Sequence, residues 1–161
     1  PQRRAIEAVW YAGRMMGETI AQTITGTKPS YQPGVWFNSA KFFDIEYQNY
    51  GVVPPQCPAD CTAFYWEASD KKKCIKVIFE TDTKAVKGVN IFGIRNRHEV
   101  WDEWISKGKS IQFVMENLPK ANFDPEFFTH WEGDIQQKFN AEFPNLSVSV
   151  RKKSFLEKIL S

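Results

Sequence analysis

The middle of the chain limits the fold most strongly, because short strand-like segments alternate there with tight turns. One strand is predicted to begin at residues 64–66, and two further strands are predicted at 74–80 and 86–92. The charged turns 70–73 and 81–84 separate these three strands. Turns of this length join consecutive strands into hairpins. The central third of the chain therefore predicts an antiparallel meander.

A further strand is predicted before these hairpins, ahead of the proline-rich loop 53–58. Apolar and polar residues alternate in it, which is typical of a strand with one face on the core and the other in solvent. The apolar set is Phe43, Ile45 and Tyr47, and the polar set is Asp44, Glu46 and Gln48. We therefore expect an antiparallel sheet of about four strands.

Helical patterns lie on both sides of the predicted sheet. Residues 5–22 repeat small and apolar side chains at helical spacing on more than one face, so this helix is expected to pack between two layers. Segment 29–39 is interpreted as an aromatic, irregular connector. After the sheet, helices are predicted at 96–108, at 110–117, and from the Asp-Pro pair at 124–125 through Trp131 to residue 143. This order favours an α+β fold with flanking helices.

Local signals mark where some helices begin. Asn96 with Glu99 and Ser154 with Glu157 form capping-box patterns, and segment 124–125, Asp-Pro, combines a capping acid with a proline suited to a first helical position. Between these last two signals, apolar residues alternate at Leu146, Val148 and Val150. That alternation is typical of an extended segment.

Composition gives no argument for a nucleic-acid or membrane partner. The 21 Lys and Arg nearly balance the 19 Asp and Glu, which leaves a net charge of +2 at pH 7. No apolar run approaches the roughly 20 residues that a membrane helix needs. Segment 1–4 also lacks the apolar core of a secretory signal, so a cytoplasmic location is expected.

The three cysteines predict a reducing compartment and no metal site. They are Cys57, Cys61 and Cys74, an odd number in a chain large enough to fold without disulfides. Cys57 and Cys61 are separated by three residues, whereas redox and zinc-ribbon pairs are separated by two, and no second pair follows. We interpret all three as structural or incidental.

No self-sufficient catalytic motif is present. The nine glycines never form the Gly-x-Gly-x-x-Gly loop that holds a nucleotide pyrophosphate. His98 is expected on the solvent side of its helix, and His130 is not expected to pair with Glu132, because adjacent helical residues point in different directions. Asp44 and Glu46 are explained by a solvated strand face. The residues alone therefore predict no catalytic group and no metal ligand.

Three stretches nevertheless resemble one enzyme family. Residues 4–18 are similar to the final helix of the FAD-binding domain in pyridine nucleotide-dependent flavoprotein oxidoreductases. Segment 33–39, Pro-Gly-Val-Trp-Phe-Asn-Ser, and the strand at 42–51 resemble the Trp-Phe-x-Ser segment and first strand of the C-terminal domain in the ferredoxin-reductase and apoptosis-inducing-factor branch. Segment 87–93 resembles that domain's last strand. The likeness covers roughly residues 4–127.

The resemblance implies that the chain is the C-terminal part of an oxidoreductase that uses FAD and NAD(P)H, with both dinucleotide-binding domains upstream. Residues 1–28 are then the last helix of the FAD-binding domain, 29–127 the reductase C-terminal domain, and 128–161 a helical extension. Such a part is expected to complete the flavin pocket and the acceptor or dimer interface, and to be inactive alone. The absence of a His-Pro-Thr-x-x-Glu motif makes disulfide reduction doubtful, while ferredoxin-type proteins, oxygen and quinones stay open as acceptors.

The same resemblance implies which residues approach the flavin. The first turn of the first helix is expected near the pyrimidine edge, where helix amides stabilise negative charge. The implied cofactor-contacting residues are Arg4, Ile6, Glu7, Trp10, Trp36 and Phe37. For the aromatic members, ordinary packing between domains is an equal alternative.

A second hypothesis uses no cofactor. The chain is 15% aromatic, which is consistent with an exposed aromatic patch on a stand-alone α+β interaction or dimerisation module. Such a module is expected to bury its first helix unaided, whereas a truncated enzyme leaves that helix exposed or paired with a second copy.

Overall fold

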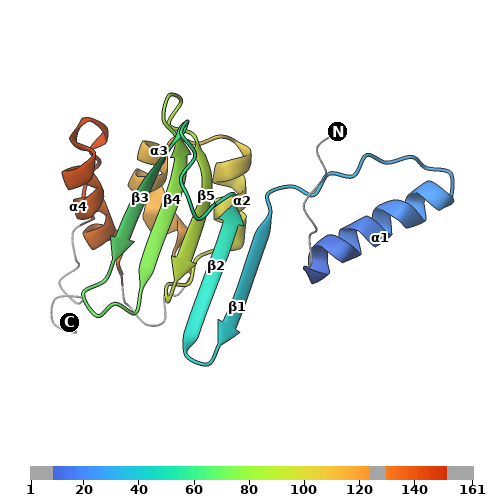
Figure 1. The fold of residues 1–161 in the computed structure, drawn as a ribbon, viewed down its shortest axis with the longest axis horizontal. Helices are drawn as coiled ribbons and strands as arrows, with labels where there is room; N and C mark the ends of the chain where they lie inside the picture. The colour runs from blue at the N-terminus through green and yellow to red at the C-terminus, as the bar shows by residue number, and fades with distance from the viewer. Residues whose placement is uncertain (1–8, 124–129, 152–161) are drawn as a thin grey trace. The chain divides into compact units, whose positions relative to one another are not determined.

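The computed structural model describes residues 9–123 and 130–151, and the chain divides into two units, Pro1–Gly34 and Val35–Ser161. The first unit contains helix α1, Trp10–Ile24 (Figure 1). Arg14 and Glu18, one turn apart, form an ion pair of 2.8 Å along it. The helix is followed by Gly26, whose φ of +96° suits glycine. The predicted residues 5–8 of this helix lie outside the described residues.

The second unit contains a five-stranded antiparallel sheet. Its strands are β1, Phe37–Phe42; β2, Ile45–Gly51; β3, Cys61–Glu67; β4, Cys74–Glu80; and β5, Val86–Phe92. Their order across the sheet is β1-β2-β5-β4-β3. The α+β prediction is confirmed, with one strand more than the four expected. The additional strand is β1, in a segment whose first part had been predicted to be irregular.

The hairpin of β1 and β2 differs from the sequence prediction in its register. Phe43 does not lie in a strand but in the turn, with a φ of +53° and a side chain that is 97% exposed. Gln48 and Tyr50 are the buried residues of β2, so the buried face is the opposite of the one predicted. Gln48 is stable there because its amide donates to Asn96 O at 3.0 Å and accepts from Asn96 N at 2.7 Å.

The connection from β2 to β3 crosses the face of the sheet opposite the helices. It must pass β5 and β4, and Lys76 Nζ donates to Pro54 O at 3.4 Å on the way. The chain leaves β2 directly over Gly88, where an added Cβ would lie 2.5 Å from the backbone N and O of Val52. Only glycine leaves room for this crossing.

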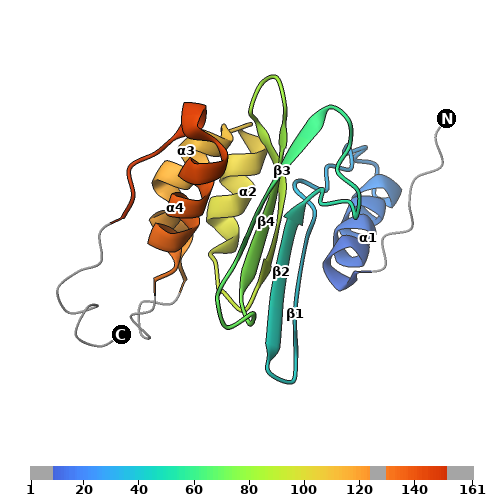
Figure 2. The same ribbon diagram turned by 60° about the vertical axis from the view of Figure 1, so that its left-hand side comes forward.

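The helices that the structure describes in the second unit lie on one face of the sheet (Figure 2). They are α2, His98–Ser106; α3, Ile111–Asn117; and α4, Glu132–Glu142, with short 3-10 turns at Leu118–Ala121 (η1) and Pro144–Leu146 (η2). The core between the two layers includes the fully buried Phe64, Val77, Val89, Trp101, Val114 and Phe139. Because Ile135, Phe139 and Val148 belong to it, the C-terminal segment 130–151 shares its core with the sheet.

Two helix starts illustrate the limits of local signals. Ser110 caps α3 by accepting from Phe113 N at 3.2 Å. Asn96 does not cap α2; Arg97 is the capping residue, and the buried Asn96 Oδ1 accepts from Trp101 Nε1 at 2.8 Å instead. The capping signals predicted at 124–125 and at 154–157 lie outside the described residues.

Candidate functional site

The residues implied as flavin contacts are divided between the two units. Arg4, Ile6 and Glu7 lie outside the described residues. Trp10 is the first residue of α1 and is 79% exposed. Trp36 and Phe37 lie at the start of β1, where Trp36 O accepts from Gly51 N at 2.7 Å. Whether these residues meet around a flavin stays a prediction.

His98 lies in an aromatic setting rather than in solvent. It is the first residue of α2, and its ring centroid is 4.1 Å from that of Phe37 and 5.4 Å from that of Tyr50. Its Nδ1 is buried, and no hydrogen-bond partner for it occurs in the described segments. Burial, together with the Glu99 carboxylate, raises the pKa of Tyr50 to about 12. The prediction that His98 faces solvent is therefore wrong, because Phe37 of β1 and Tyr50 of β2 cover its ring.

The thiols of Cys61 and Cys74 are not activated. All three cysteines are free, and Cys57 is exposed while Cys61 and Cys74 are half-buried. Desolvation and the neighbouring Asp60 raise the pKa of Cys61, and desolvation also raises that of Cys74. Across residues 9–123 and 130–151, no group of three or more His, Cys, Asp or Glu side chains is placed to hold a metal ion.

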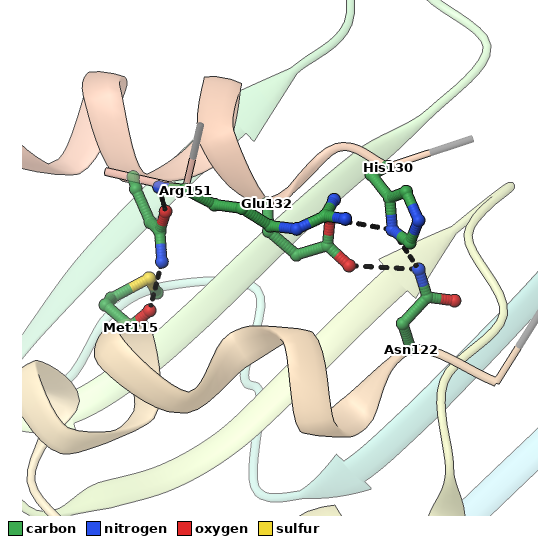
Figure 3. Close-up of polar contacts among 6 residues, drawn as sticks. Met115, Asn122, His130, Glu132 and Arg151 are labelled. Carbon is green, nitrogen blue, oxygen red and sulfur yellow. Dashed lines mark hydrogen bonds and ion pairs between the residues drawn. The ribbon is translucent and has the colours of Figure 1, made fainter. Parts of the chain in front are cut away.

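A buried polar cluster lies where the C-terminal segment meets the rest of the domain (Figure 3). Its centre is Glu132, which is 5% exposed. The Glu132 carboxylate accepts from Asn122 Nδ2 at 2.9 Å, lies 3.3 Å from Arg151 Nη1 and lies 3.4 Å from His130 Nδ1. A buried carboxylate needs such partners, since an unpaired charge in the core is costly.

This cluster corrects the prediction that His130 and Glu132 do not pair. The prediction assumed that both residues are helical, but α4 begins at Glu132 and His130 precedes it. The chain before the helix is therefore free to turn the imidazole back toward the carboxylate. Asn122 Nδ2, 3.1 Å from His130 Nδ1, joins the same group from η1's C-terminal end.

A stripe of polar side chains on α4 holds the chain that follows it. Glu132, Gln136 and Asn140 are spaced four residues apart and so share one helix face. Asn140 accepts from Val148 N and donates to Val148 O, both at 2.8 Å, and Gln136 accepts from Arg151 N at 2.7 Å. Gln136 also donates to Met115 O on α3 at 2.8 Å (Figure 3). The extended segment is therefore bonded to helix side chains, and the structure assigns no strand to residues 147–151.

A pocket of about 300 Å³ adjoins Glu132. It lies where the start of β4 and the end of β5 meet η1 and the start of α4. Aliphatic side chains line it together with Trp131 and several polar groups. The aliphatic members are Ile75, Ile91, Ile94, Leu118 and Ile135, and the polar members are Lys73, Arg95, Asn96, Asn122 and Glu132. The residues come from distant parts of the sequence, so no local motif could have indicated the pocket.

Comparison with known proteins supports the fold. No protein-family model and no curated protein matches the chain. Among solved structures, the chain is similar to an NAD-dependent persulfide reductase from A. fulgidus, with a TM-score of 0.57 and 19% identity over 70% of this chain. The match covers 24% of that reductase, so this chain corresponds to about a quarter of it. At this identity the likeness establishes the fold alone.

The described residues do not provide a dinucleotide site of the usual kind. That site needs a parallel strand, a glycine-rich loop and a helix N-terminus, whereas every strand pair in the described sheet is antiparallel. A site of that kind would therefore need residues beyond those described. In the part of the chain that the structure describes, no helix is long and apolar enough to cross a membrane.

Proposed function

We propose that this chain is the C-terminal part of an oxidoreductase that uses FAD and NAD(P)H. In such an enzyme hydride passes from the nicotinamide to the flavin, and this part completes the flavin pocket and shapes access for the acceptor. The observation that supports it best is the agreement of two independent indications. The sequence resembles the end of a flavin domain followed by a reductase C-terminal domain, and the fold is shared with part of an NAD-dependent reductase.

The arrangement of the second unit is consistent with that role. The segment that resembles the family's Trp-Phe-x-Ser motif leads into β1, and Phe37 is fixed there against His98. The backbone of Trp36 is held by a hydrogen bond from Gly51 N to Trp36 O. Gly51 is the last residue of β2 and has a φ of +68°. Both aromatic residues thus have a defined backbone position from which to contact a neighbouring domain.

The first experiment is to sequence the coding DNA upstream of Pro1 in the same reading frame. The proposal expects two Gly-x-Gly-x-x-Gly strand–helix units and a Gly-Asp motif just before the first helix. The protein expressed from the whole reading frame should be yellow, and NADH or NADPH should bleach it under anaerobic conditions. Residues 1–161 expressed alone should bind no flavin and should not oxidise either nucleotide.

A pair of variants then tests the aromatic contacts in the whole enzyme. Trp36→Ala should change the fluorescence or the retention of the flavin, and Phe43→Ala, in the exposed turn of the same hairpin, should leave both unchanged. An upstream region without dinucleotide fingerprints would refute the oxidoreductase proposal. The stand-alone interaction module would then be the better account, with the exposed hairpin tip at Phe42, Phe43 and Ile45 as its first candidate surface.

A further inference from the structure

The pocket beside Glu132 combines an apolar lining with hydrogen-bond donors that are not fully used. Ile75 and Ile91 come from the sheet, and Leu118 and Ile135 come from the helical layer, so apolar surface lines it from both layers. Pockets that bind small molecules are typically apolar with a few polar groups, in volumes of about 300–1,000 Å³. This pocket, at about 300 Å³, suits a small ligand.

Gly93 helps to shape the pocket by allowing β4 and β5 to approach closely where they border it. Its φ is +66°, and an added Cβ would lie 2.4 Å from Lys72 O and 3.0 Å from the Cγ of Lys73. The aliphatic stem of Lys73 therefore lies over Gly93. Its ammonium is 4.9 Å from the centre of the Trp131 ring and 3.3 Å from Asp70 Oδ2.

The polar groups of the pocket that can still form hydrogen bonds to a ligand are mainly donors. An ammonium has three N–H groups, and within residues 9–123 and 130–151 Lys73 Nζ donates one hydrogen bond, to Asp70. Asn96 Oδ1 is used by Trp101, whereas Asn96 Nδ2 donates no hydrogen bond within residues 9–123 and 130–151. Glu132, the one carboxylate lining the pocket, already accepts from Asn122 and Arg151.

The charges limit the class of ligand further. A cation would meet Lys73 and Arg95 in the lining, while the Glu132 carboxylate is already compensated. Lys73 and Arg95 each have a carboxylate partner, Asp70 and Glu46, so little positive charge remains for a phosphate dianion. A single negative charge on an apolar body fits these conditions best.

We propose that this pocket is a binding site for a small amphipathic monocarboxylate. Its aliphatic or aromatic body lies against the isoleucine and leucine side chains, and its carboxylate accepts from Lys73 Nζ and Asn96 Nδ2. The site belongs to the sheet and helices of the second unit and is independent of whether upstream flavin and nicotinamide domains exist. It gives the C-terminal segment a role, since Trp131, Glu132 and Ile135 form one of its walls.

The test is a titration of the 161-residue chain with matched pairs of probes, followed by NMR. Hexanoate is compared with hexanamide, and phenylacetate with phenylacetamide, so that each pair differs in charge and hardly in shape. The signals observed are the Trp131 indole N–H, assigned with Trp131→Phe, and the methyl groups of Ile75, Ile91 and Ile135. We expect at least one carboxylate to shift these signals and to bind roughly tenfold more tightly than its amide, because a charge-assisted hydrogen bond is lost in the amide.

Variants at one lysine locate the charge. Lys73→Met keeps most of the aliphatic stem and should weaken the carboxylate about tenfold while leaving the amide unchanged, and Lys73→Arg should retain binding. Lys107→Met is the control, since Lys107 also pairs with a neighbouring carboxylate, Glu103, but directly follows α2 and does not line the pocket. Amide N–H spectra of each variant confirm that it is folded.

Four results would overturn the proposal. The first is no shift of the pocket signals by any carboxylate. The second is equal binding of carboxylate and amide, and the third is carboxylate binding that Lys73→Met does not weaken. Displacement of the carboxylates by inorganic phosphate at equal concentration would also contradict it, because it would indicate an anion site without apolar selectivity.

Discussion

Strands β4 and β5 are buried much more deeply than the hairpin of β1 and β2. In β4 and β5, the residues facing the helices are almost completely buried, with Val77 and Val89 at 0% exposure. In the β1–β2 hairpin, Phe42, Phe43 and Ile45 are all more than half exposed. The helical layer covers β3, β4, β5 and the buried end of β2, whereas the turn end of the hairpin extends past it (Figure 2). Strand propensity alone therefore does not measure how much a residue stabilises this domain.

The largest expected effect comes from comparing two phenylalanines in these regions. Phe139 is fully buried, with Phe64 and Phe143 at centroid distances of 5.4 and 5.2 Å. Phe139→Ala should lower the free energy of unfolding by about 3–5 kcal/mol, because a cavity replaces the ring. Phe43→Ala should change it by less than about 0.5 kcal/mol, as an exposed substitution. Urea unfolding of both variants measures the difference, and equal losses would mean that the hairpin tip is covered.

The crossing over Gly88 should be nearly as sensitive. Gly88→Ala places a Cβ 2.5 Å from the backbone of Val52, and backbone cannot move aside as a side chain can. We expect a loss of about 1–3 kcal/mol in the same unfolding measurement. Gly13→Ala, in a helix with open space around it, should instead stabilise by about 0.5–1 kcal/mol. An unchanged stability of Gly88→Ala would show that the β2–β3 connection does not lie over β5.

The polar stripe of α4 can be tested with two neighbouring glutamines. Gln136 is 1% exposed and bonds both Met115 O and Arg151 N, so Gln136→Leu leaves buried backbone groups without partners. A loss of about 1–3 kcal/mol is expected. Gln137 is exposed, and Gln137→Leu should be close to neutral. Hydrogen exchange at the Arg151 amide should accelerate only in the first variant.

The smallest effect concerns acid pH. Lys87 and Thr83 lower the pKa of Glu80, the Lys72 amide lowers that of Asp70, and Lys107 lowers that of Glu103. A carboxyl group whose folded pKa lies below its unfolded value binds fewer protons when folded, so its stabilisation is present above the unfolded pKa, near 4, and is lost as pH falls through the folded pKa. Thermal unfolding from pH 6 to pH 2.5 should show this loss, and Glu80→Gln should reduce it.

Much of the sheet could be predicted because its signals are local. The bounds predicted for β4 and β5 match the structure, since charged turns separate two strands that pair directly with each other. The face of β2 could not be predicted in the same way. Gln48 is polar, and it is buried only because Asn96, 48 residues later, satisfies its amide.

Little of the candidate site could be predicted from the sequence. His130 and Glu132 were visible as a pair of residues, but their contact depends on where α4 begins. The pocket is lined by residues of four elements that come together only in the folded chain. No spacing of residues in the sequence therefore predicts it. The flavin contacts inferred from resemblance stay a prediction, since half of them lie outside the described residues.

The stripe on α4 also sets the smallest part of this chain that can be expected to fold by itself. A product that stopped at residue 127, where the family resemblance ends, would lack Phe139 and Ile135 from its core. One that stopped at residue 146 would keep the helix but remove the partners of Asn140 and one partner each of Gln136 and Glu132. A truncation meant to isolate the domain should therefore retain every residue through Arg151.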